Sequence, residues 1–269
     1  MTLANILVHI DSHPRAAVRL ALARKLVDRD GARLTGVFAE MADARQVGVV
    51  AVWPSERYAQ ARRAAQALFE RETADLGQRA AFIDVNRGGE AEILGRVADI
   101  ARSFDLIVLG QTEEDAVAPA SLPQHLITES GRPVLVAPFV GAYPDIGHRI
   151  LFAWRPSRGA ARALADARLV ATRDCDGLVV EIARATAPPD EFSSLVIANL
   201  ASHGVRASYR RIVGEDIGVM DALLNAAADH SADLLAIGGF DAGAFALLGR
   251  GAGTRFVLGH MTMPVLFSH

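Results

Sequence analysis

The residues best suited to hold a ligand lie near the end of the chain, in a stretch rich in glycine. An apolar run at residues 234–237 ends at Gly238 and Gly239, and more glycines follow at positions 243, 249, 251 and 253. Glycine has no side chain, so the backbone amides of such a loop can come close to a ligand's polar or anionic groups. A helical pattern at 254–260 and an apolar run at 265–267 complete a strand–loop–helix–strand unit. In a right-handed crossover of this kind, the loop and the helix start face a ligand crevice.

Residues that carry out catalysis are scarce. No G-x-S-x-G nucleophile motif occurs, and His9 lies inside an apolar run, where we expect a packed imidazole rather than a base. The single cysteine, Cys175, excludes an internal disulfide. Because it lies between Asp174 and Asp176, its pKa should be raised, which disfavours a reactive thiolate.

The crossover unit occurs twice. Residues 104–110 (FDLIVLG) align with 232–238 (ADLLAIG) without a gap, and 129–137 (ESGRPVLVA) align with 260–268 (HMTMPVLFS) with proline in register. The chain openings also pair, 5–17 with 149–161. The sequence therefore predicts two copies of one domain, at residues 1–140 and 149–269, joined by a turn-rich linker at 141–148.

Each copy alternates short apolar runs with helical patterns, which predicts parallel sheets covered by helices on both faces. The least regular part of the first copy is 41–54 (MADARQVGVVAVWP). We interpret it as a loop packed on the sheet or, alternatively, as a cover for the crevice or for a partner surface.

Each copy resembles a universal stress protein domain, and the whole chain resembles a tandem universal stress protein. The resemblance covers nearly all of residues 2–269 and is clearest in the ending HMTMPVLFSH, in ADLLAIGG and in the two opening strands. It implies two tandem doubly wound, parallel five-stranded sheets of the adenine-nucleotide alpha-hydrolase-like class, each with strand order 3-2-1-4-5. It also implies dimerisation through the fifth strand.

The resemblance implies a phosphate-binding loop in the second copy. Nucleotide-binding members of the family cradle phosphates with Gly-x-x-Gly, nine residues, then Gly and Ser/Thr. Gly238 and Gly251 occupy two of these positions, while Asp241 and Ala252 replace the other two. Thr254 and the neighbouring glycines would make up for the two replaced positions by holding the phosphates along a different path of the loop. The candidate ligand is ATP, with Mg²⁺.

The family also places an acidic residue after the first strand. Asp11 has this position in the first copy, whereas Arg155 replaces it in the second. The phosphate loop of the first copy is short and contains three consecutive acids at residues 113–115, whose charges should repel a triphosphate. The tentative nucleotide-binding residues Gly238, Gly251, Thr254 and Asp11 are therefore divided between the two copies.

Composition excludes several functions. The net charge of −3 gives no basic footprint for nucleic acid or for an anionic membrane. No apolar run approaches the roughly 20 residues that span a bilayer, and the first residues lack a secretion signal. We expect a cytoplasmic protein.

We expect a non-catalytic stress-response protein with an eroded nucleotide-binding loop. Its two copies should pair within the chain through the strands at 133–137 and 264–267, which begin at Pro133 and Pro264; a further homodimer stays open. One alternative is an ATP-binding or slowly ATP-hydrolysing nucleotide sensor of the same fold. Another is a small-molecule carrier that uses residues 46–53 as a lid.

Overall fold

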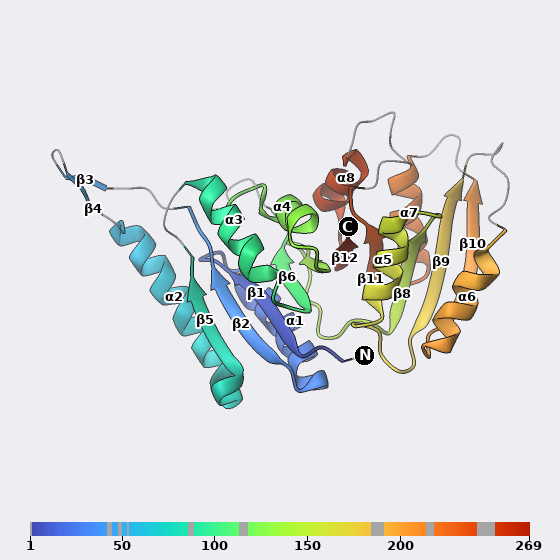
Figure 1. Ribbon diagram of the computed structural model, residues 1–269, viewed down its shortest axis with the longest axis horizontal. Helices are drawn as coiled ribbons and strands as arrows, with labels where there is room; N and C mark the ends of the chain where they lie inside the picture. Colours follow the sequence, from blue (N-terminus) through green and yellow to red (C-terminus); the bar gives the residue numbers. More distant parts are fainter. Residues whose placement is uncertain are drawn as a thin grey trace. The chain divides into compact units, whose positions relative to one another are not determined.

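The computed structural model describes residues 2–41, 45–47, 50–52, 54–85, 89–112, 118–183, 191–213, 218–240 and 251–269 (Figure 1). The chain divides into two compact units, Thr2–Val134 and Leu135–His269. The predicted linker at 141–148 lies inside the second of these units.

The first half contains five strands of a main sheet with helices between them. In chain order the elements are β1 (Asn5–Ile10), α1 (Ala16–Asp30), β2 (Arg33–Phe38), α2 (Glu56–Thr73), the 3₁₀ helix η1 (Ala74–Arg79), β5 (Ala80–Asp84), α3 (Glu90–Ala101), β6 (Leu106–Gly110), α4 (Leu122–Glu129) and β7 (Val134–Ala137). The strand order is β5-β2-β1-β6-β7, and β1 pairs in parallel with both β2 and β6. Helix α1 packs against α2, and α3 packs against α4 on the other face (Figure 1).

The second half repeats this arrangement. Its elements are β8 (Arg149–Trp154), α5 (Arg158–Ala167), β9 (Asp176–Ala183), α6 (Ser193–Ser202), β10 (Arg206–Val213), α7 (Val219–Asp229), β11 (Leu234–Gly238), α8 (Ala252–His260) and β12 (Val265–Ser268). The strand order is β10-β9-β8-β11-β12. Both halves therefore have the order 3-2-1-4-5 that the resemblance implied, and that prediction is confirmed.

Local sequence explains where several helices begin and end. Helix α1 ends at Gly31, whose φ of 69° is left-handed and whose N–H donates to the carbonyl of Val27. Ser55 caps α2 by accepting a hydrogen bond from the N–H of Tyr58. Ser157 caps α5 in the same way. These residue types are the common terminators and initiators of helices, so the sequence placed these boundaries well.

One aspartate ties the start of the sheet together in each copy. Asp105, just before β6, accepts hydrogen bonds from the N–H groups of Ala4 and Asn5 at 2.8 Å. At the equivalent position before β11, Asp233 accepts hydrogen bonds from the N–H groups of Gly147, His148 and Arg149 at 2.8–2.9 Å. The repeated FD and AD dipeptides therefore anchor the first strand of each sheet at the end opposite the ligand crevice.

The irregular segment 41–54 forms an element that the sequence did not predict. Strands β3 (Arg45–Val47) and β4 (Val50–Val52) pair with each other in an antiparallel hairpin, in a small sheet separate from the main one. The expectation of a loop packed on the sheet is wrong in this respect, because the apolar, β-branched run pairs with itself. The side chains of this hairpin lie outside the described part, as do residues 42–44, 48, 49 and 53. Whether residues 46–53 form a lid over the crevice therefore stays a prediction. Within the described chain, the helices are too short or too polar for one to cross a membrane.

Candidate functional site

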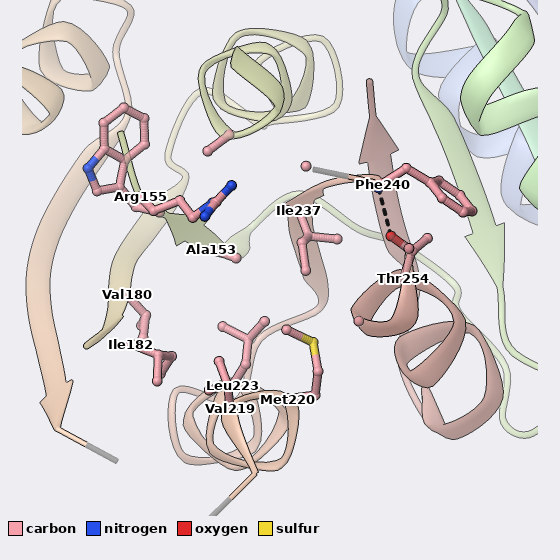
Figure 2. A pocket seen from close by; sticks show the side chains of 15 residues that line it. Ala153, Arg155, Val180, Ile182, Val219, Met220, Leu223, Ile237, Phe240 and Thr254 are labelled. Atoms are coloured by element: carbon pink, nitrogen blue, oxygen red, sulfur yellow. Dashed lines mark hydrogen bonds between the residues drawn. The ribbon is translucent and has the colours of Figure 1, made fainter. Parts of the chain in front are cut away.

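The second unit has a pocket at the carboxyl ends of β8, β9 and β11, where doubly wound folds bind their ligands (Figure 2). The open space in and around it, solvent at its mouth included, is about 690 Å³. Helix α7 contributes one wall and the start of α8 another. Most of the described lining is apolar, including Val180, Ile182, Val219, Met220, Leu223 and Ile237. This lining can bury the apolar body of a small molecule.

Arg155 supplies the positive charge of this pocket. It follows β8 directly and is the charged side chain among the described lining residues. In Figure 2 its guanidinium extends above the strand ends toward Ile237, on the side opposite Leu223 and Val219. The equivalent position of the first unit holds Asp11. The exchange of an acid for a base therefore reverses the charge at the same place in the fold.

The glycine predicted to open the phosphate loop has a packing role. A Cβ atom added at Gly238 would lie 2.6 Å from the carbonyl carbon of Gly159 and 2.8 Å from the nitrogen of Ala160. Both neighbours are backbone atoms at the start of α5, and they cannot move away as a side chain could. Glycine at 238 therefore lets α5 pack closely on β11, whatever ligand the pocket holds.

Gly251 and Thr254 hold Phe240 in place. Gly251 has a φ of 79°, and a Cβ there would lie 2.3 Å from Cδ1 of Phe240. The hydroxyl oxygen of the buried Thr254 accepts a 2.8 Å hydrogen bond from the N–H of Phe240 (Figure 2). Phe240 has a φ of 53°, a left-handed conformation that costs a non-glycine residue about 1 kcal/mol or more. The ring thus covers the glycine where a phosphate would have to approach the backbone.

The matching pocket of the first unit is smaller and polar. Its empty volume is about 320 Å³, and its lining includes His9, Asp11 and Gly110. Arg19 reaches into it from α1, with Nη2 2.5 Å from Oδ1 of Asp11 and Nε 3.3 Å from the carbonyl oxygen of His9. A Cβ at Gly110 would lie 2.5 Å from Nη1 of Arg19. In this unit the glycine after the fourth strand makes room for an arginine of the protein itself.

Two buried groups beside Arg19 have shifted pKa values. Burial by itself raises the pKa of Asp11, but Arg19, His9 and the hydrogen bonds that the carboxylate accepts outweigh it, and the net pKa is lowered. Burial lowers the pKa of His9, although Asp11 opposes this shift. The imidazole is therefore neutral at pH 7, and its Nε2–H faces the carbonyl oxygen of Ala39 at 3.3 Å.

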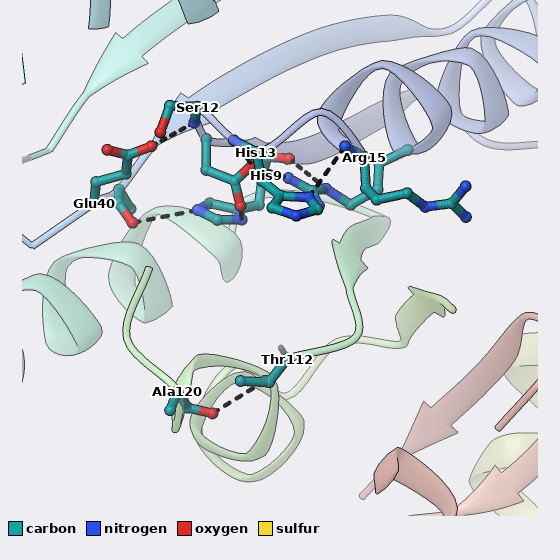
Figure 3. Close-up of polar contacts among 10 residues, drawn as sticks. His9, Ser12, His13, Arg15, Glu40, Thr112 and Ala120 are labelled. Atoms are coloured by element: carbon teal, nitrogen blue, oxygen red, sulfur yellow. Dashed lines mark hydrogen bonds and ion pairs between the residues drawn. The ribbon is translucent and has the colours of Figure 1, made fainter. Parts of the chain in front are cut away.

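The loop after β1 is fixed by contacts with its own neighbours (Figure 3). Nδ1 of His13 accepts a hydrogen bond from the N–H of Arg15 at 3.1 Å. The buried Glu40 carboxylate accepts a hydrogen bond from the N–H of Ser12. His9 is buried, as the sequence predicted.

The structure brings three of the four predicted site residues together. Gly238, Gly251 and Thr254 line the second-unit pocket, whereas Asp11 lines the pocket of the first unit. The acidic stretch 113–115 and Asp241 lie outside the described residues. Sequence reasoning missed Phe240 and Arg19, because neither belongs to a local motif. Only the three-dimensional contacts with Gly251 and Gly110 reveal them.

The described residues do not fit a Mg²⁺-triphosphate. In the second unit Phe240 covers Gly251, and in the first unit Arg19 occupies the neighbourhood of Asp11, so a side chain of the protein lies at each place where the nucleotide would approach. Cys175 is fully buried, and burial, together with the charges of Asp233 and Asp176, raises its pKa to about 12. The expectation of an unreactive thiol is consistent with this shift.

Neither a family model nor a curated protein sequence matches the chain. A universal stress protein from Archaeoglobus fulgidus DSM 4304 has a similar structure, with a TM-score of 0.70 and 14% identity over 98% of this chain and 95% of that one. A protein of unknown function from Pseudomonas aeruginosa PAO1 matches with a TM-score of 0.60 and 16% identity, over 99% and 92% of the two chains. A proposed universal stress protein from Pseudomonas aeruginosa UCBPP-PA14 matches with a TM-score of 0.58 and 17% identity, over 99% and 93%. The resemblance drawn from the sequence is thus confirmed for the fold: the chain has the universal stress protein fold in tandem.

Proposed function

We propose that this chain is a non-catalytic, stress-response protein that binds a small molecule in its second unit. The observation that carries the proposal is the apolar pocket at the carboxyl ends of β8, β9 and β11. In the matching pocket of the first unit, the side chain of Arg19 takes part of the space and binds Asp11. One unit is then a binding domain and the other a structural copy of it. We place the protein in the cytoplasm.

The chemistry of the described lining supports binding without catalysis. Arg155 is its charged group, and a guanidinium stays protonated and cannot act as a general base at neutral pH. Thr254 is buried, and its oxygen already accepts the hydrogen bond from Phe240. A nucleophile would need a neighbouring base, and the described lining supplies none.

An ATP-binding or slowly ATP-hydrolysing sensor is the alternative that the fold itself raises. The position of Phe240 over Gly251 disfavours it, because the backbone approach that the phosphates require is covered. The variant Gly251→Val would test this poorly. Its Cβ would clash with Phe240 and its φ would be strained, so the pocket would change whether or not ATP binds.

Titration of the full chain with two probes tests the proposal. N-phenyl-1-naphthylamine, an uncharged apolar molecule, should bind with one site per chain and gain fluorescence, because the apolar lining removes its rings from water. Mg-ATP should show no heat of binding in calorimetry up to millimolar concentration. Binding of Mg-ATP below that range, with no binding of the naphthylamine, would contradict the proposal and favour the nucleotide sensor.

We also propose that the two copies pair within the chain through β7 and β12. Each is the fifth strand in its half's order and is almost wholly apolar, with the sequences VLVA and VLFS. An apolar strand at the end of a five-stranded half favours pairing with a like strand. Intrachain pairing predicts a particle of 28.6 kDa in sedimentation, with slow hydrogen exchange along both strands at every concentration. Protection that disappears on dilution would indicate pairing between chains, and rapid exchange in both strands would exclude either kind.

A further inference from the structure

We infer that Met220 is an oxidation site in the second-unit pocket, and that conversion of its thioether to the sulfoxide by a hydroperoxide weakens the binding of an apolar ligand there. This inference rests on the proposed function, because it adds a reversible control to the same pocket. The chemistry belongs to one side chain of α7 and needs no catalytic partner from the protein.

The thioether of Met220 lies at the pocket. The side chain extends from α7 toward Ile237, with Leu223 of the same helix beside it (Figure 2). The residue is 7% exposed, and the space that it lines continues into solvent. A hydroperoxide as small as hydrogen peroxide therefore reaches the sulfur through the same opening that a ligand would use.

The other described sulfur atoms lack this combination of access and position. Met41 lies just after β2 in the first unit and is 44% exposed, and Met263 is half-buried between α8 and β12. Met261 is buried, and none of these three methionines lines either pocket. Cys175 is buried and its pKa is raised to about 12, so a peroxide finds no accessible thiolate there.

The oxidation is a single oxygen-atom transfer. A lone pair of the thioether sulfur attacks one oxygen of hydrogen peroxide, so an S–O bond forms as the O–O bond breaks. The sulfur loses two electrons, and the peroxide gains them. The proton of the transferred hydroxyl passes to the departing hydroxide, and water leaves. Methionine sulfoxide reductases reverse the change.

The added oxygen changes what the pocket offers to an apolar ligand. A sulfoxide is polar, and its oxygen is a hydrogen-bond acceptor, whereas the thioether is a soft apolar surface. Leu223 and Ile237 flank the thioether in Figure 2, and their aliphatic side chains donate no hydrogen bond. A ligand that covers the sulfoxide would therefore remove its oxygen from water without replacing that hydrogen bond.

Mild oxidation of the full chain with hydrogen peroxide, which is then removed, tests both parts of the inference. Trypsin releases residues 212–250 as one peptide in which Met220 is the only methionine, so mass spectrometry shows directly whether oxygen is added there. Titration with N-phenyl-1-naphthylamine before and after oxidation measures the affinity. Met220→Leu and the control Met41→Leu would be treated in parallel, with circular dichroism to confirm that each chain is folded.

Oxidation should weaken the naphthylamine on the order of tenfold in the unmodified chain and in Met41→Leu. Met220→Leu should keep its affinity within about threefold before and after oxidation, because leucine has a similar volume and no sulfur. Methionine sulfoxide reductases for both epimers, with dithiothreitol, should restore binding to the oxidised chain. Bound naphthylamine should slow oxygen uptake at Met220 and leave that at Met41 unchanged.

Three results would overturn the inference: no oxygen in the 212–250 peptide while Met41 is oxidised, unchanged affinity when Met220 is oxidised, or an equal loss of affinity in oxidised Met220→Leu. In each case, saturable binding to the untreated chain would leave the proposed small-molecule site standing. If the naphthylamine does not bind the untreated chain, the proposed function fails, and control of ligand binding by Met220 fails with it. Oxygen uptake in the peptide would still decide whether Met220 is an oxidation site.

Discussion

Replacing Arg19 with methionine should lower the free energy of unfolding by about 3 kcal/mol, because it leaves the carboxylate of Asp11 buried without its cation. Only 5% of the Arg19 side chain and 11% of the Asp11 side chain are exposed, and the two atoms in contact are 2.5 Å apart. Urea unfolding followed by circular dichroism would measure the loss. Arg102→Met is the matched control, because its ion pair with Asp99 is exposed and should contribute less than about 1 kcal/mol.

The double variant Arg19→Met/Asp11→Asn separates the ion pair from the rest of the arginine. Its loss of unfolding free energy should be smaller than the sum of the two single-variant losses by about 1 kcal/mol or more, because removing both charges leaves no unpaired ion. If the two losses simply add, Arg19 stabilises the unit only by packing. The claim that its ion pair with Asp11 contributes to stability would then be wrong.

The same cluster predicts acid sensitivity. The folded-state pKa of Asp11 lies below its unfolded value, so its contribution is present above the unfolded pKa and is lost as the pH falls through the folded one. The pKa of His9 is also lowered, so the unfolded chain takes up a proton first as the pH falls below the ordinary value of 6.5. Both shifts therefore make the first unit less stable in acid than at pH 7.

Gly238→Ala should cost about 2–3 kcal/mol of unfolding free energy, because its Cβ would overlap the backbone of Gly159 and Ala160. Gly110→Ala is the matched variant at the same position of the first copy. Its Cβ would meet the end of the Arg19 side chain, which can shift, so the loss should be about 1 kcal/mol. Differential scanning calorimetry of both variants measures the difference. Equal losses would show that the two glycines have one common role, such as ligand approach.

Many helices and strands were predictable because the sequence pattern of each occurs in both copies. The match of 104–110 with 232–238 carries over without a shift to β6 and β11, and Gly31 and Ser55 mark helix ends with local chemistry. The strand order was not in the spacing and came from the family resemblance alone. The hairpin of β3 and β4 escaped because a short apolar run looks the same in a packed loop and in a strand that pairs with itself.

The site was only half predictable for a physical reason. Aligning a motif tells which residues share a loop, and it brought Gly238, Gly251 and Thr254 correctly to one pocket. It does not tell what fills the space that a glycine leaves. At Gly110 the space is taken by an arginine from α1, and at Gly251 by the ring of Phe240. Side chains that arrive from elsewhere in the fold decide whether a glycine serves a ligand or the protein.

The central claim is that the second unit has an apolar ligand pocket, and that the first unit has a smaller, polar one into which Arg19 reaches. The most direct test is to locate a bound probe. The full chain with labelled Ile, Leu and Val methyl groups would be titrated with N-phenyl-1-naphthylamine and followed by NMR. The account predicts saturable shifts at Leu223 and Ile237 in the second-unit pocket, with Leu109 and Leu122 in the first-unit pocket unchanged. Shifts at Leu109 and Leu122 at the same concentrations, or none at any of the four, would contradict it.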